Sequence, residues 1–235
     1  MKNIIITGCS SGIGEAAVRY LTEHIACKLI GISRNENKLS QISNELKNLN
    51  CVGEFVPLPF DLSITNKYNV LYNKIQEHLS SVDILINNAG SLLNKSFEKI
   101  NTNEFDHVML TNFKAPFFLI KELLPLFSVS SHILNISSMG GFQGSIKFPG
   151  LSVYSASKAA LANLTECLAS ELSDRKIYVN AIAPGAVETD MLKQAFPDFK
   201  APVTASQMGE YISTFALHGH TFFNGKILPV SLSTP

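Results

Sequence analysis

A tyrosine and a lysine stand four residues apart in the segment YSASK, at Tyr154 and Lys158. Side chains at this spacing share one face of a helix. A free phenol has a pKa of about 10, and a nearby positive charge favours its ionised form. We therefore predict that Tyr154 exchanges a proton with a substrate and that Lys158 supplies the charge that brings this exchange closer to neutral pH.

A serine upstream could act on the same substrate. Ser138 ends the apolar run NISS, where its hydroxyl could donate to a carbonyl oxygen that becomes alkoxide-like. It would polarise the group that Tyr154 protonates. A tyrosine and a lysine at this spacing also occur as an exposed helix pair without function, so the prediction depends on the surrounding motifs.

A glycine-rich turn, TGCSSGIG, lies between the first apolar run and the first helical segment. At this place in a dinucleotide-binding fold the pyrophosphate rests on the amides of a helix N-terminus. Such a turn can also exist without a ligand. The residues predicted to hold a cofactor here are Gly8, Ser10, Ser11, Gly12, Ile13 and Gly14.

In dinucleotide-binding folds, residues about 20 positions further on, at the end of the second strand, distinguish NAD from NADP. This place holds Ser33 and Arg34 and no carboxylate. A guanidinium can bind a 2′-phosphate with paired hydrogen bonds, which favours NADP(H), unless Arg34 is simply a solvated loop residue. Lys38 could add a weaker attraction.

The pattern of apolar runs predicts an α/β fold: a Rossmann-like, doubly wound parallel sheet flanked by helices in three αβα layers, formed by one domain over residues 1–235. The predicted strands are Asn3–Thr7, Lys28–Ser33, Glu54–Phe60, Asp83–Asn87, His132–Ser137, Ile177–Ile182 and Lys226–Val230. The predicted helices are Gly14–Ala26, Leu39–Leu49, Thr65–Leu79, Thr102–Phe127 and Ser155–Ser173, with a kink or break expected near Pro116 and Pro125.

The amino-acid composition limits the classes of molecule that the protein is expected to bind. Of 235 residues, 46% are hydrophobic, and 19 basic residues balance 19 acidic ones, so no basic field attracts nucleic acid. The four cysteines form no CxxC pair, and no signal peptide or membrane span is evident. We expect a cytoplasmic protein that binds neither a membrane nor a metal.

Taken in order, these motifs resemble those of the short-chain dehydrogenase/reductase family. The chain carries the family's TGxxxGxG turn, its NNAG segment at residues 87–90, and the YxxxK pair. Asn112 matches the family's helix asparagine, and NAIAPGAVET at residues 180–189 matches its nicotinamide loop. The resemblance implies reduction of a ketone or aldehyde, or oxidation of the alcohol, by hydride transfer.

The resemblance also implies roles for individual residues. The catalytic set would be Asn112, Ser138, Tyr154 and Lys158, with Asn112 holding a water on a proton relay to Lys158. Tyr154 and Lys158 would also contact the cofactor. Further cofactor contacts would come from Asp61 and Leu62 at the adenine ring, from Asn88, Ala89 and Gly90 beneath the cofactor, and from Pro184, Gly185, Val187 and Thr189 at the nicotinamide. An aspartate at a strand end can instead form a turn.

Two loops set our expectations for the substrate. The segment Met139–Val153 is rich in apolar residues and should border a small or apolar carbonyl compound. The segment Asp190–Pro202 is short, which suggests an open site. Relatives often pair through helices matching Thr102–Phe127 and Ser155–Ser173, so a homodimer or homotetramer is expected. The alternatives are a non-catalytic NADP(H)-binding sensor, an NAD-linked alcohol dehydrogenase and a 3-oxoacyl-type reductase.

Overall fold

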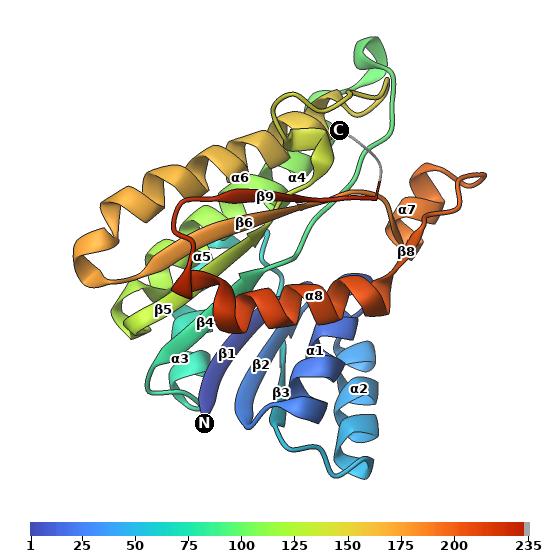
Figure 1. Cartoon of the computed structure of the whole chain (residues 1–235). Coiled ribbons are helices and arrows are strands. Elements are labelled where there is room, and N and C mark those ends of the chain that lie inside the picture. Colours follow the sequence, from blue (N-terminus) through green and yellow to red (C-terminus); the bar gives the residue numbers. More distant parts are fainter. Residues whose placement is uncertain (233–235) are drawn as a thin grey trace.

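The computed structural model describes residues 1–232. Seven parallel strands form one sheet in the order β3-β2-β1-β4-β5-β6-β9, shown in Figure 1. Their bounds are Lys2–Thr7 (β1), Cys27–Ser33 (β2), Glu54–Pro59 (β3), Val82–Asn87 (β4), Phe127–Ile136 (β5), Tyr178–Pro184 (β6) and Ile227–Val230 (β9). The chain order reverses between β1 and β4, and at such a point the carboxyl ends of parallel strands open a crevice for ligands.

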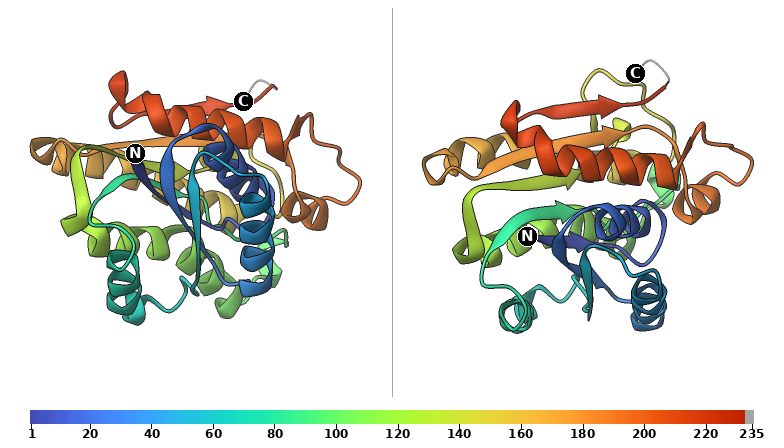
Figure 2. Two further views of the ribbon diagram at one scale, coloured as in Figure 1. Left: turned by 90° about the horizontal axis from the view of Figure 1, so that it is seen from below. Right: turned by 60° about the horizontal axis from the view of Figure 1, so that its bottom comes forward.

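Helices cover both faces of the sheet, as the two views of Figure 2 show. One face packs against α1 (Gly12–His24), α2 (Glu36–Asn48) and α8 (Ala205–His218). The other packs against α3 (Tyr68–Gln76), α5 (Ala115–Leu123) and α6 (Ser152–Glu171). Along β1, Ile4 and Ile6 point to the first core and Ile5 to the second. Strands buried on both faces explain the absence of polar alternation in the sequence and confirm the predicted doubly wound fold.

The predicted helix over residues 102–127 is interrupted near its two prolines, as expected, but its end at Phe127 is wrong. It divides into α4 (Thr102–Met109), a π-helical turn at Leu110–Lys114, α5, and a 3₁₀ turn at Leu124–Leu126. Proline explains the breaks, because it lacks the N–H that an α-helix needs and collides with the preceding turn. Pro116 lies just after the π turn, and Pro125 lies in the 3₁₀ turn. Phe127 already begins β5, which starts five residues before the predicted strand.

Four elements near the carboxyl end were not predicted. They are β7 (Val187–Glu188), α7 (Asp190–Ala195), β8 (Val203–Thr204) and α8. The start of α8 carries a recognisable signal, since Thr204 and Gln207 form a capping box. Gly209 lets α8 approach α1 closely: a Cβ there would lie 2.6 Å from the Ala16 side chain. Within residues 1–232 no helix is long and apolar enough to cross a membrane.

Candidate active site

A cleft of ≈ 350 Å³ opens at the carboxyl ends of β1, β2 and β4. Most of the predicted cofactor and catalytic residues line it together: Gly8, Ser10, Ser11, Gly12, Ile13, Ser33, Arg34, Asp61, Leu62, Asn88, Ala89, Gly90, Tyr154, Lys158 and Thr189. Six predicted residues do not line it: Gly14, Asn112, Ser138, Pro184, Gly185 and Val187. The cleft is large enough for a small-molecule site.

The glycine turn has the geometry of a cradle for a flat, extended group. Gly8 and Gly12 take φ values of +67° and +57°, a region that disfavours other residues. A Cβ on Gly8 would lie 2.6 Å from the Ala89 Cα, and one on Gly12 would lie 3.2 Å from the Thr189 methyl. Gly14 is buried behind the turn, where a Cβ would strike the Gly8 carbonyl.

Beside the turn, the end of β2 presents a hydroxyl and a guanidinium. The Ser33 hydroxyl donates to the Ser10 hydroxyl at 2.8 Å, which ties β2 to the glycine turn. Arg34 is exposed at the cleft wall, and among residues 1–232 no ion pair engages its guanidinium. The group is thus available to an anion in the cleft.

The floor of the cleft is fixed by the NNAG segment. The Asn88 side-chain amide donates to the carbonyls of Thr7 and Gly8 at 3.1 and 3.0 Å. The backbone N–H groups of Asn88 and Ala89 both donate to the Thr7 hydroxyl at 3.0 Å. These four bonds join β4 to the glycine turn across the reversal point, so the segment holds the turn open for a ligand.

Asp61 has a local role in the structure. Its carboxylate accepts from the Ser63 N–H at 2.9 Å, which is an Asx turn after β3. The Leu62 carbonyl accepts from the Tyr68 hydroxyl at 2.7 Å, which anchors the same turn to α3. Asp61 and Leu62 also line the cleft, so the turn after β3 forms part of the cleft wall.

The side chains of Tyr154 and Ser138 come from the start of α6 and the end of β5. A hydrogen bond between their hydroxyls lowers the pKa of Tyr154, but burial, the larger effect, raises it above its usual range. The expectation of a lowered pKa is therefore wrong for this structure. Desolvation disfavours the phenolate more than its neighbours stabilise it, so Tyr154 holds its proton.

Lys158 is buried one helical turn from Tyr154. Its ammonium donates to the Ile136 carbonyl at 2.7 Å, and burial lowers its pKa to about 8. The Ser137 hydroxyl donates to the Lys158 carbonyl at 2.8 Å and fixes this part of α6 on β5. Lys158 can therefore change its charge near neutral pH.

Asn112 lies fully buried in the π-helical turn behind the cleft. Its carbonyl oxygen accepts from the Ser91 N–H at 2.7 Å, and its amide donates to the Ser91 carbonyl and to the Ser157 hydroxyl, both at 2.9 Å. Ser157 in turn donates to the Tyr154 carbonyl at 2.7 Å. The side chain thus connects the floor segment to the helix that carries Tyr154 and Lys158. π turns are frequent at functional sites.

The apolar side chains that we expect to border the substrate line a recess of their own. Phe142, Phe148 and Leu151 line a second recess of ≈ 690 Å³ and are absent from the cleft wall. Gly141 packs against α6 so closely that a Cβ would lie 2.6 Å from the Ala159 nitrogen. The start of this loop stays beside the site, since a Cβ on Gly140 would lie 3.6 Å from the Tyr154 ring.

Sequence reasoning missed seven residues that line the cleft: Ile32, Phe60, Ser63, Thr111, Ile136, Asp190 and Met191. Each is a direct neighbour or near neighbour of a predicted residue. Phe60 had a signal, since an aromatic residue precedes Asp61 at the end of a strand. Asp190 and Met191 follow Thr189 as the first residues of α7, which was itself not predicted.

Comparison with known proteins agrees with this architecture. The family model described as short chain dehydrogenase matches residues 2–200. The 2-dehydro-3-deoxy-D-gluconate 5-dehydrogenase of Dickeya dadantii is 34% identical over 201 residues, 84% of this chain and 76% of its own. A dehydrogenase/reductase from Sinorhizobium meliloti superposes with a TM-score of 0.87 at 28% identity, covering 98% and 93% of the two chains. RhlG of Pseudomonas aeruginosa, solved as an active-site complex with NADP, gives a TM-score of 0.87 at 25% identity, covering 98% and 94%.

A doubly wound sheet with a cleft at its switch point is the architecture typical of dinucleotide-binding oxidoreductases. The chain belongs to the short-chain dehydrogenase family. Members of this family act on alcohol or carbonyl groups of small molecules and use NAD or NADP.

Proposed function

We propose that this protein is an NADP(H)-dependent reductase of a ketone or aldehyde, with Tyr154 as the proton donor. The observation that carries the proposal is the placement of Arg34, Tyr154 and Lys158 on the wall of one cleft. When bound, the nicotinamide cofactor supplies or accepts a hydride. The same path run backwards oxidises the alcohol.

The residues present fit such a cofactor. The turn from Gly8 to Gly14 leaves space that side chains would fill, and it leads into the N-terminus of α1, where amides favour phosphate groups. The open guanidinium of Arg34 fits a 2′-phosphate, and no carboxylate stands beside it at Ser33. Asp61 and Leu62 would border the adenine ring, and Thr189 the nicotinamide. The NADP complex of RhlG supports this choice by analogy.

The side chains of the site would transfer one proton to the substrate oxygen and then replace it. Tyr154 keeps its proton because burial raises its pKa, which suits it to protonate a developing alkoxide. Ser138, bonded to the same hydroxyl, would donate to the substrate oxygen. Lys158, with its pKa lowered to about 8, would favour return of a proton to the phenolate. Asn112 holds α6 and the floor segment in register for this transfer.

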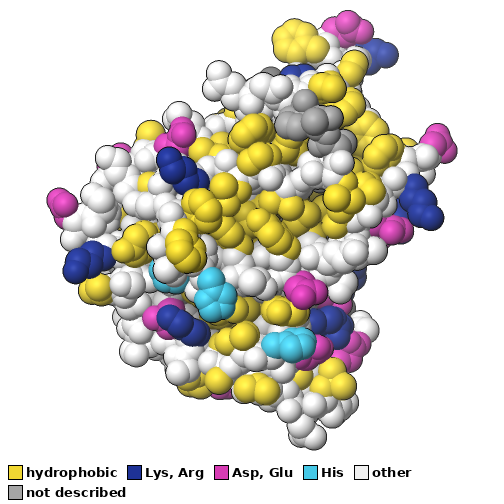
Figure 3. All heavy atoms as spheres, in the orientation of Figure 1, with side chains coloured by type: hydrophobic (Ala, Val, Ile, Leu, Met, Phe, Trp, Pro, Cys, Tyr) yellow, Lys and Arg dark blue, Asp and Glu magenta, His cyan; other side chains and the backbone are white. Residues whose placement is uncertain are grey.

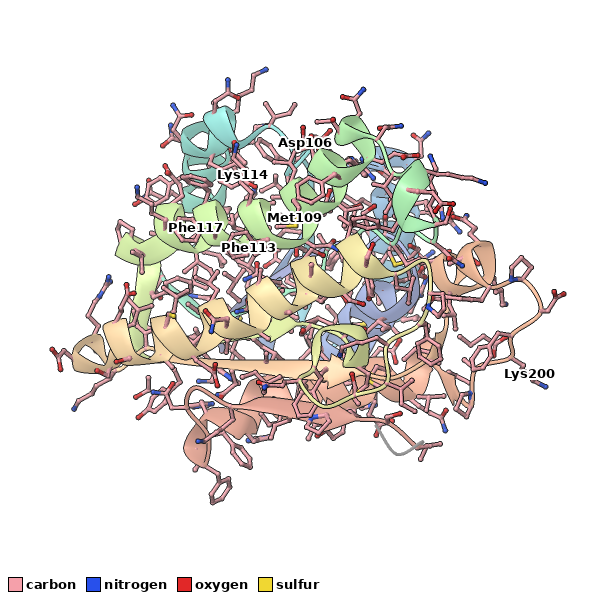
Figure 4. The ribbon with its side chains drawn as sticks, turned by 90° about the horizontal axis from the view of Figure 1, so that it is seen from above. Asp106, Met109, Phe113, Lys114, Phe117 and Lys200 are labelled. Carbon is pink, nitrogen blue, oxygen red and sulfur yellow. The ribbon has the colours of Figure 1, made fainter. Side chains whose placement is uncertain are left out.

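The wider setting follows from the same proposal. We propose that residues 1–235 form one cofactor-binding domain in a cytoplasmic homodimer or homotetramer that acts on a small carbonyl compound. Exposed aromatic side chains support assembly. Phe117 lies with Phe113 along the outer side of α5 and the π turn in Figure 4, and it is 38% exposed. A second apolar area lies around β6 and β9 in Figure 3, and Phe222, which follows α8, is 82% exposed.

The test is a fluorescence titration of the purified protein with NADPH and NADH, followed by NADPH oxidation with a panel of ketones, aldehydes and diketones. We expect NADPH to bind more tightly and at least one compound to be reduced. Arg34→Ala should weaken NADPH binding about ten- to hundredfold and leave NADH unchanged, the loss of one charge-assisted contact. Lys47→Ala, which removes an exposed cation from the far end of α2, is the control. Tighter binding of NADH refutes the role of Arg34, and tight NADPH binding without turnover favours a sensor.

A further inference from the structure

The helix α7 lies over the mouth of the cleft. Its first residues, Asp190 and Met191, line the cleft that also reaches Tyr154 and Lys158. From there residues 190–202, which we call the lid, run outward and return to β8. Within this lid the hydrogen bonds are mostly local, such as Leu192 N–H to the Thr189 hydroxyl at 3.2 Å. Its two ends are fixed by the pairing of β7 with β8, so a contact at α7 decides how the middle of the lid sits over the site.

One side chain reaches the lid from the loop that follows β4. The Asn94 amide donates to the carbonyl of Ala195, the last residue of α7, at 2.8 Å. The two residues are 101 positions apart in the chain. Among residues 1–232, this is the hydrogen bond that ties α7 to a segment outside residues 187–199. Carbonyls at a helix C-terminus lack partners within the helix, so Asn94 also satisfies a group that would otherwise need water.

Asn94 is itself held from two sides. We call residues 94 and 95 the strap. The Lys95 N–H donates to the Gly150 carbonyl at 3.0 Å, which joins the strap to the loop after β5. Gly150 has φ +86°, and a Cβ there would collide with the Asn94 side chain. The Lys95 ammonium pairs with Glu104 on α4 at 2.6 Å. Within residues 1–232 the strap is thus anchored to α4 and to the loop after β5, and its Asn94 amide reaches the lid.

We propose that Asn94 is a latch: a positioning residue that holds the lid closed over the site and so controls entry of the carbonyl compound and release of the product. The inference rests on the proposed function for its kinetic consequence, but the closed lid is a property of the protein alone. The bond is exposed and single. Such a bond holds the lid closed while letting it open repeatedly during turnover.

Trypsin reports lid opening directly, without substrate. Lys193 and Lys200 are exposed cleavage sites on the lid, and Figure 4 shows Lys200 at its outer tip. We expect Asn94→Ala to speed cleavage at both sites about two- to tenfold, the change in open population that corresponds to one ordinary hydrogen bond. Cleavage at Lys67, remote in the fold, should not change, which separates lid opening from general destabilisation.

Two further variants sharpen the test. Asn94→Asp keeps the shape that packs on Gly150 but cannot donate to Ala195, so it should cleave as fast as Asn94→Ala. Asn69→Ala removes an exposed asparagine from α3 and should behave as the wild type. Equal cleavage rates at Lys193 and Lys200 in the wild type and both Asn94 variants would overturn the latch.

Kinetics gives a second readout. With the best compound of the panel, Asn94→Ala should raise KM while kcat stays constant or rises, because a looser lid weakens substrate binding and speeds product release. A fall in kcat at unchanged KM contradicts the latch. If no compound is turned over but the trypsin result holds, the proposed function fails and the latch stands.

Discussion

A buried histidine should make the stability of this protein depend on pH below neutrality. His132 on β5 is fully buried, and its two ring nitrogens lie 2.9 Å from the Ala216 carbonyl and 3.1 Å from the Asn180 amide nitrogen. The Ala216 carbonyl can only accept, and the Asn180 amide can only donate. His132 is therefore neutral, with Nδ1 donating and Nε2 accepting.

Protonation would place two donors face to face at Asn180. That amide is fixed by its second bond, to the Phe223 carbonyl at 2.9 Å, so it cannot turn away freely. Burial, the main cause, lowers the pKa of His132 from 6.5 to about 4, and the bond to Ala216 opposes this only in part. The nearby ring of His220, with a centroid separation of 5.3 Å, disfavours the charge further.

The size of the effect follows from linkage. The unfolded chain binds a proton near pH 6.5, whereas the folded one resists until about pH 4. The contribution of His132 to the free energy of unfolding is therefore complete above pH 6.5 and is lost as the pH falls toward 4. At about 1.4 kcal/mol per pH unit, the gap corresponds to about 3 kcal/mol from this one group.

Urea denaturation between pH 7 and pH 4 measures this loss. His132→Gln keeps one donor and one acceptor but cannot titrate, so its stability should be lower at pH 7 and should fall with pH by about 3 kcal/mol less than that of the wild type. His78→Gln, at an exposed position on the turn after α3, should follow the wild-type slope. Parallel curves for the wild type and His132→Gln would show that the reasoning is wrong.

Three further substitutions test the site. Tyr154→Phe should lower kcat by about 10² to 10⁴ without changing NADPH affinity, and equal turnover would exclude its role as proton donor. Lys158→Met should abolish activity yet raise the free energy of unfolding at pH 7 by about 1 kcal/mol. A pKa lowered from 10.5 to about 8 means that burying the charge costs about 3 kcal/mol, and loss of the charge-assisted bond to Ile136 offsets about 2 of this gain. A destabilised Lys158→Met would contradict this estimate. Gly8→Ala should unfold at lower urea concentration and lose NADPH binding, because the new Cβ meets the Ala89 backbone at 2.6 Å. Gly144→Ala, also at positive φ but in open space, should be destabilised less, because only backbone strain opposes it.

The strands and the cleft could be predicted because their signals are local. A run such as Ile4 to Ile6 bounded by a glycine turn specifies a buried strand and the place of its carboxyl end. Parallel strands then bring those ends to one edge of the sheet, so Gly12, Arg34 and Tyr154 meet without further information. The exact positions of the helix breaks were harder to predict. Pro116 is incompatible with a regular α-helical turn before it, but it does not determine at which residues the π turn forms.

What the sequence could not show depends on contacts between distant segments. The direction of the Tyr154 pKa shift is set by burial against the stabilising bond from Ser138, and neither can be read from the spacing of YxxxK. The recess lined by Phe148 forms between the loop after Ser138 and α6, which Gly141 allows to pack closely together. Asn94 is the clearest case: nothing near it in the sequence marks a functional residue, and its meaning arises only when β4 and β6 lie in one sheet and bring Ala195 within 2.8 Å. The reacting groups are thus encoded by motif, whereas access to them is encoded by tertiary contact.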